Sequence, residues 1–144
     1  MQAVPDPGHR RSLSFPADQD GSLRRGREFT RRALAQWHLC APHTRAPPLL
    51  AEDVLLVTSE LLVNACLHGG GPRKMVVEHL PGAVRVAVSD TSPILPHRHR
   101  IEAGRPGGYG LLIVERLAVC WGATADTDGK TVWAQLLTTR PQWC

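Results

Sequence analysis

The sequence predicts an α/β fold of the α+β type, a two-layer sandwich in which helices cover one face of a mixed, mostly antiparallel sheet. Two hairpins predict the antiparallel pairing, because strand-like runs flank both Pro81-Gly82 and Asp128-Gly129. Three separate segments have helical patterns, and the stretch at residues 55–69, within the central one, consists mostly of good helix formers. The 144 residues suffice for one domain with a hydrophobic core.

Composition and charge narrow the function classes. The net charge of +4 permits an acidic partner or a nucleotide but does not demand nucleic acid. Four scattered cysteines without a Cys-x-x-Cys pair suggest neither a zinc site nor a disulfide framework, so we expect free thiols in a reducing cytoplasm. No apolar run is long enough to span a bilayer or to act as a leader, which predicts a cytoplasmic protein without membrane contact.

The first elements are an arm, a strand and a helix. Residues 1–11 contain several Pro and Gly and are expected to form a disordered arm, followed by a single domain over residues 12–138 and a tail over residues 139–144. Residues 12–15 alternate polar and apolar and end at Pro16, which predicts a short edge strand. A helix is expected over residues 22–39, and its buried stripe comprises Leu23, Phe29, Ala33, Leu34 and Trp37.

Five arginines crowd this first helix. They are Arg24, Arg25, Arg27, Arg31 and Arg32. The general expectation for such a run is a solvated charged face, and the alternative is a docking surface for an acidic partner.

The central helix is predicted over residues 49–68, and Gly69 to Pro72 end it. Apolar residues surround nearly its whole circumference, so we expect it to be buried rather than amphipathic. Yet Glu60 and Asn64 lie one turn apart on one face, and His68 extends the stripe. A buried carboxylate without a partner is costly, so something polar should lie against this face. Either an internal salt-bridge network or a ligand with a metal would satisfy it.

Four more strands and a helix follow. Residues 74–80 and 83–90 form the first hairpin, with Val84, Val86 and Val88 facing inward. A long irregular connection then runs over residues 91–105, and loops of this length are usually functional lids or disordered segments. The glycines of residues 106–110 precede a helix and allow backbone amides to approach an anion, although a simple hinge has the same composition. Residues 119–125 and 130–136 form the second hairpin.

Three motifs occur in a specific order. A Glu60-Leu61-x-x-Asn64-Ala65 helix comes first, a strand that ends at Asp90 second, and a Gly107-Gly108-Tyr109-Gly110-Leu111 turn into a helix third. Together they resemble the GHKL ATPase superfamily, which has the Bergerat fold, and within it the small serine-kinase anti-sigma factors. The resemblance covers residues 13–137. The chain departs from the common Asp-x-Gly-x-Gly pattern, because Thr91-Ser92-Pro93-Ile94 follows Asp90.

The resemblance implies a role for each motif. Asn64 would be the magnesium ligand, Glu60 the general base that activates a serine hydroxyl, and Asp90 the acceptor for the adenine amino group. Residues 91–105 would be the ATP lid. The turn and the helix start would hold the phosphates of ATP through Gly107, Gly108, Tyr109, Gly110 and Leu111. Oxygen ligands combined with phosphate oxygens suit Mg²⁺.

The implied function is a serine/threonine protein kinase that acts as an anti-sigma factor. It would phosphorylate an antagonist protein and sequester a sigma factor, and the resemblance favours a homodimer. The alternative is a non-catalytic, nucleotide-gated binding module, to which Val63 points because relatives frequently carry a hydroxyl residue there. A basic nucleic-acid-binding domain is a third class, but it lacks a base-reading motif and leaves the Glu60–Asn64 face unexplained.

Overall fold

The predicted α+β architecture is confirmed. The computed structural model describes residues 9–16, 21–40, 49–92, 94 and 110–138. In chain order its elements are β1 (Arg10–Ser14), α1 (Ser22–Gln36), α2 (Leu50–His68), β2 (Pro72–Leu80), β3 (Ala83–Asp90), α3 (Gly110–Leu117), β4 (Cys120–Asp126) and β5 (Gly129–Leu137). The predictions for the N-terminal arm up to residue 8, the loop at 41–48, most of the lid and the tail concern residues outside the described ranges. The domain bounds therefore stay a prediction.

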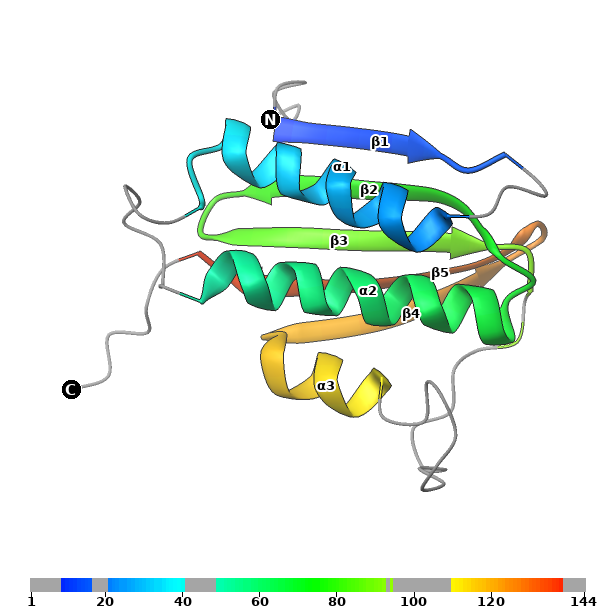
Figure 1. Ribbon diagram of the computed structural model, residues 1–144. Coiled ribbons are helices and arrows are strands. Elements are labelled where there is room, and N and C mark those ends of the chain that lie inside the picture. The colour runs from blue at the N-terminus through cyan, green and yellow to red at the C-terminus, as the bar shows by residue number, and fades with distance from the viewer. Residues whose placement is uncertain (1–8, 17–20, 41–48, 93, 95–109, 139–144) are drawn as a thin grey trace, which may run out of the picture.

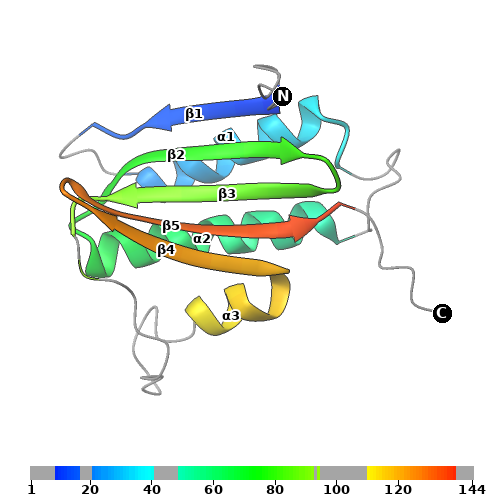
Figure 2. The same ribbon diagram turned by 180° about the vertical axis from the view of Figure 1, so that it is seen from behind.

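The five strands form one open sheet in the order β1-β2-β3-β5-β4, and each of its four pairings is antiparallel. All three described helices lie on one face of this sheet (Figure 1), and the view from behind shows the sheet in front of them (Figure 2). The inward residues Val84, Val86 and Val88 of β3 are buried, as their alternation predicts. β1 occupies the edge predicted for it.

α2 lies between α1 and α3 and contacts both of them as well as the sheet. The prediction that α2 is buried all round was wrong, because Leu56 and Leu67 are 43% and 50% exposed. In a two-layer sandwich a helix turns only one side to the sheet. Within the described part of the chain, no third layer covers the outer side of α2.

The first helix differs from its prediction in two ways. It ends at Gln36 rather than at residue 39, because His38 takes a left-handed conformation (φ 56°) and the Leu39 amide donates to the Leu34 carbonyl. This is the hydrogen-bond pattern of a Schellman cap. Leu23, expected in the buried stripe, is 38% exposed, whereas Gly26 is buried.

Close contact between α1 and α2 explains the burial of Gly26. A Cβ atom at this position would lie 2.5 Å from Cδ1 of Leu62, so only glycine allows the two helices to approach this closely. At the start of the domain, Arg10 and Arg11 belong to β1, which corrects their assignment to the arm. Cys40, Cys66 and Cys120 are free thiols. None of the helices in the described ranges is both long and apolar enough for a membrane span.

Candidate functional site

Glu60 and Asn64 lie on the side of α2 that faces away from α1. Leu62, which packs against Gly26 of α1, is two residues from each of them. Two residues correspond to a rotation of about 200° around a helix, so both polar side chains point away from the α1 contact. α3 contacts α2 and lies on its far side from α1 (Figure 1). The stripe therefore faces the side from which α3 approaches.

The environment of these two side chains is partly desolvated. Glu60 and Asn64 are half-buried, whereas His68 at the end of the predicted stripe is exposed. Burial raises the pKa of the Glu60 carboxyl above its ordinary value. Neither Glu60 nor Asn64 has a hydrogen-bond or ion-pair partner among the residues that the structure describes. The internal salt-bridge network that the sequence left open is thus not found there.

The oxygen atoms of this stripe fit a magnesium ion that also binds phosphates. Asn64 and Glu60 offer hard oxygen donors, which Mg²⁺ prefers. The described residues contain no cluster of three or more His, Cys, Asp or Glu side chains that could hold a metal ion. A dedicated protein cage is therefore not formed by this part of the chain. One or two protein oxygens combined with nucleotide phosphates is the usual arrangement for Mg²⁺.

Asp90 ends β3, as predicted, but its surroundings were not predicted. Its carboxylate is 1% exposed and forms an ion pair with Lys130, whose Nζ lies 2.8 Å from Oδ2. The backbone amide of Ser92 donates to Oδ1 at 2.9 Å. Each carboxylate oxygen can accept a further hydrogen bond. Because the Asp90 side chain is almost fully buried, a base can contact its carboxylate only if neighbouring residues move aside.

The end of α2 contacts Asp90 directly at Gly69. A Cβ atom at Gly69 would overlap the Asp90 carboxyl group, and the Gly69 carbonyl accepts hydrogen bonds from Thr91 N and Oγ1 at 3.2 and 3.0 Å. Asn64 precedes Gly69 by five residues, which corresponds to about 7.5 Å along a helix axis. The structure thus brings the first and second motifs to one end of the sheet.

The third motif is described only in part. Gly110 is the first residue of α3, and Leu111 is half-buried in its first turn. This turn points to the end of the sheet where α2 and β3 end (Figure 1). Gly107, Gly108 and Tyr109 lie outside the described residues, as does the lid except for positions 91, 92 and 94. Their proposed contacts with phosphates stay a prediction.

Sequence reasoning missed Lys130. It is 1% exposed, and the register of the sheet places it directly opposite Asp90 on the neighbouring strand. A signal was available, because Lys130 shares its strand face with three apolar residues at a period of two, which are Val132, Ala134 and Leu136. A lysine in phase with a buried face needs a counter-ion.

Replacement of Gly69 by alanine is the sharpest test of the contact with Asp90. Gly69 has φ −118°, which alanine adopts without strain, so the added methyl group acts through its overlap with the Asp90 carboxyl group and through a close contact of 2.8 Å with the Ala65 carbonyl oxygen. We expect Gly69→Ala to weaken ATP binding at least tenfold, measured by calorimetry. Gly26→Ala is the matched control, because its Cβ would overlap Leu62 instead. Equal ATP affinities of both variants and wild type would contradict this arrangement.

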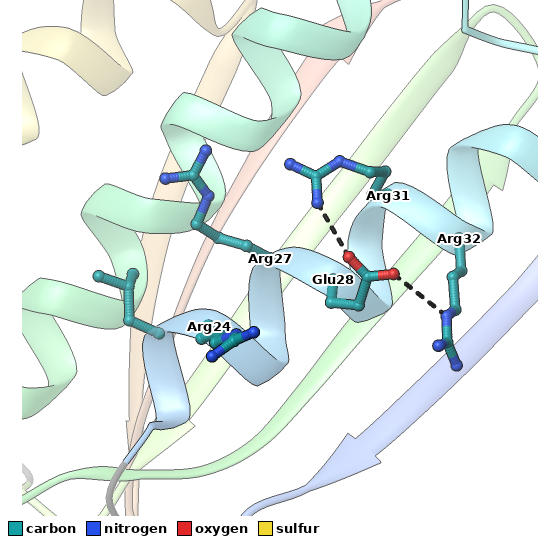
Figure 3. Close-up of a pocket in the computed structure, with 6 residues that line it drawn as sticks. Arg24, Arg27, Glu28, Arg31 and Arg32 are labelled. Carbon is teal, nitrogen blue, oxygen red and sulfur yellow. Dashed lines mark hydrogen bonds and ion pairs between the residues drawn. The ribbon is translucent and has the colours of Figure 1, made fainter.

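A second feature lies on α1. An open hollow of about 530 Å³ is lined by Leu23, Arg24, Arg27, Glu28, Arg31 and Arg32. Glu28 pairs with both Arg31 and Arg32, at 2.9 and 3.3 Å (Figure 3). No partner is found for the guanidinium groups of Arg24 and Arg27 within the described ranges. The hollow is lined by residues of α1 alone, whereas the Glu60–Asn64 stripe lies on the side of α2 that faces away from α1, so the hollow is not part of the candidate nucleotide site.

The comparison with protein families identifies one match. The model of the histidine kinase-like ATPase domain matches residues 15–136. This range includes all the described helices, β2 to β4 and β5 except its last residue, together with each predicted site residue. A search of curated proteins gives no match.

Proposed function

The chain belongs to the histidine kinase-like ATPase domain family, which implies ATP binding, and from this premise we propose that it is a serine/threonine protein kinase acting as an anti-sigma factor. The observation that carries the catalytic part is Glu60. This carboxylate is half-buried, has a raised pKa and precedes Asn64 by one helical turn. A carboxyl group whose pKa is moved toward neutrality is a better general base at cellular pH.

Each predicted site residue has a place in this proposal. Asp90 accepts a hydrogen bond from the adenine amino group, and Asn64 binds Mg²⁺ together with the phosphates. Gly110 and Leu111 begin α3, and with Gly107, Gly108 and Tyr109 they hold the phosphates by backbone amides. The magnesium ion would neutralise charge on the phosphates, which is the largest requirement of phosphoryl transfer.

The proposed chemical step transfers the γ-phosphoryl group of ATP to a serine hydroxyl. The serine oxygen of an antagonist protein bonds to the γ-phosphorus of ATP, the bond to the bridging oxygen breaks, and ADP leaves. The hydroxyl proton moves to the Glu60 carboxylate. Because Glu60 is further from Asp90 along α2 than Asn64 is, we expect it to lie near the terminal phosphate rather than near adenine.

The alternative of a non-catalytic, nucleotide-gated module uses the same site without Glu60 chemistry. The half-buried Val63 beside Asn64 keeps it open. The deciding experiment has two arms. Calorimetry measures binding of ATP with Mg²⁺, and labelled-phosphate transfer is measured to candidate antagonists from the same genome. ATP binding without transfer to any antagonist, combined with tight binding of one of them, favours the module.

The arginine face of α1 supports docking of an acidic partner, such as the antagonist or the sigma factor. α1 contains five arginines and one glutamate, so its net charge of +4 equals that of the whole chain. Two of these arginines, Arg24 and Arg25, lie in the first turn, where the helix dipole disfavours cations. Residues that lower the stability of the helix to which they belong are typical of functional surfaces. A cytoplasmic location and a homodimer are further parts of the proposal.

Charge reversal on α1 tests this surface. We expect Arg24→Glu/Arg27→Glu to lower the affinity for the antagonist or a sigma factor at least tenfold, with unchanged ATP affinity. Thermal stability should not fall, because a glutamate in the first turn interacts favourably with the helix dipole. Lys74→Glu reverses an exposed charge on β2 and serves as control. If the double reversal does not change the partner affinity, the docking proposal is wrong and the arginines of α1 form only a solvated face.

A further inference from the structure

The ion pair between Asp90 and Lys130 is the most deeply buried charged contact that the structure describes. Both side chains are 1% exposed, and their charged atoms are 2.8 Å apart. The pair joins the last residue of β3 to the second residue of β5. Lys130 Nζ also lies 3.5 Å from the carbonyl oxygen of Ser92, two residues after Asp90 in the chain. Lys130 therefore touches both the proposed base-binding carboxylate and the backbone that follows it.

Two glycines fix the carboxylate in this contact. A Cβ atom at Gly69 would overlap the carboxyl group, and one at Gly129 would overlap the Asp90 carbonyl oxygen. The backbone at Gly129 has φ +148°, which other residues rarely adopt. Asp90 is thus held between α2 and the start of β5, and Oδ2 has little freedom to leave Lys130. Lys130 and the Ser92 amide occupy part of the carboxylate, and so they determine from which directions it can accept a further hydrogen bond.

The charge on Lys130 determines what Asp90 can do chemically. A buried carboxylate with an ammonium partner remains an anion, and an anion can only accept hydrogen bonds. A buried carboxylate without a partner takes up a proton instead, and a carboxylic acid can donate as well as accept. Adenine presents an amino donor at position 6, whereas hypoxanthine and guanine present an oxo acceptor. At position 6 an acceptor-only Asp90 can therefore hydrogen-bond to adenine but not to an oxo base, which has no donor at that position, whereas a neutral Asp90 can hydrogen-bond to either.

We propose that Lys130 determines the purine selectivity of the nucleotide site by keeping Asp90 an obligate hydrogen-bond acceptor. The inference rests on the proposed function, because it requires that Asp90 binds the base. It assigns Lys130 as a positioning residue that acts through Asp90 and does not itself contact the base. Its consequence is that loss of the Lys130 charge changes the preference between bases rather than nucleotide binding in general.

The test compares ATP with inosine triphosphate, which carries the same sugar and phosphates but an oxo group at position 6. Calorimetry measures both affinities for wild type, Lys130→Met and Lys130→Gln. Wild type should prefer ATP about 10- to 100-fold, because a charged hydrogen bond is made to one base only. In Lys130→Met the preference should fall to within about threefold, with weaker binding of ATP and equal or tighter binding of the inosine nucleotide.

A merely structural role would give a different result, because a distorted site would weaken binding of both nucleotides by the same factor. Lys74→Met is the matched control, since it removes the only other lysine, which is exposed on β2. Where Lys130→Met does not fold, as judged by circular dichroism, Lys130→Gln decides, because the amide retains hydrogen bonding to Asp90 without its charge.

Two results would overturn the proposal. One is parallel loss of both affinities in the folded Lys130 variant, and the other is equal binding of both nucleotides by wild type. A wild type that binds neither nucleotide overturns the proposed function itself, and the selectivity role with it. These failures are distinguishable, because only the last one includes a loss of ATP binding by wild type.

Discussion

Glu60→Gln is expected to lower the rate of phosphoryl transfer about 10²- to 10⁴-fold, which is the usual contribution of a general base. Glutamine keeps the shape of the side chain and its ability to hydrogen-bond, but it cannot accept the hydroxyl proton. ATP affinity should remain within about threefold of wild type, because the proposed function has Glu60 beside the terminal phosphate rather than beside adenine. The measurement is labelled-phosphate transfer to the antagonist, with calorimetry for ATP.

The pH profile provides an independent check on this assignment. A general base works only when it is deprotonated, so the transfer rate should rise with pH through the pKa of Glu60. Burial raises this pKa, and the acid limb should therefore lie above the ordinary glutamate value and should vanish in Glu60→Gln. A wild-type acid limb that persists in the variant would assign the titration to another group.

Stability gives a third expectation for the same variant. Because the pKa of Glu60 is higher in the folded state than in the unfolded chain, the folded state binds the proton more tightly. Stability from this group is therefore present at low pH and is lost as pH rises through the raised pKa. At neutral pH Glu60→Gln should equal or exceed wild type in the free energy of unfolding. Glu52→Gln, in the exposed first turn of α2, is the control, and it should leave transfer unchanged.

Local signals predicted most of the fold. The hairpin mate at residues 83–90 has the predicted bounds, since the turn at Pro81-Gly82 and the valine alternation define both of its ends. The exposure of Leu23 could not be predicted in this way. It depends on how closely α1 approaches α2, and that distance is set by Gly26 against Leu62, which are far apart in the chain. A helical pattern gives the direction of a side chain but not what lies opposite.

The same distinction applies to the site. Glu60, Asn64 and Asp90 could be assigned from motifs, because their spacing and positions within elements are local properties. The pairing of Asp90 with Lys130 depends on the register between β3 and β5, which are separated by a lid and a helix. The strand phase of Lys130 indicated an inward side chain, but only the assembled sheet shows which carboxylate it meets. Charge pairing across a sheet is a tertiary property.

This pairing makes Asp90 and Lys130 the residues with the largest expected effect on stability. Removal of one partner leaves a buried, uncompensated charge, which typically costs about 3–5 kcal/mol. We expect losses of this size for Asp90→Asn and for Lys130→Met, measured by urea denaturation. Against a typical stability of about 5–15 kcal/mol, either loss is a large fraction of the total. Lys74→Met, an exposed substitution, should stay within about 0.5 kcal/mol.

The double variant Asp90→Asn/Lys130→Met separates the cost of an unpaired charge from the worth of the pair itself. Replacement of both charged groups removes both desolvation penalties, so the double variant should be more stable than either single variant. Additive losses would instead mean that the two side chains stabilise the fold independently. The comparison of the single variants with the double variant also affects how binding data are interpreted. Asp90→Asn alone replaces the proposed anionic base acceptor by an amide and leaves the Lys130 ammonium without its counter-ion, so its weaker ATP binding identifies a base contact only when the double variant shows the same weakness.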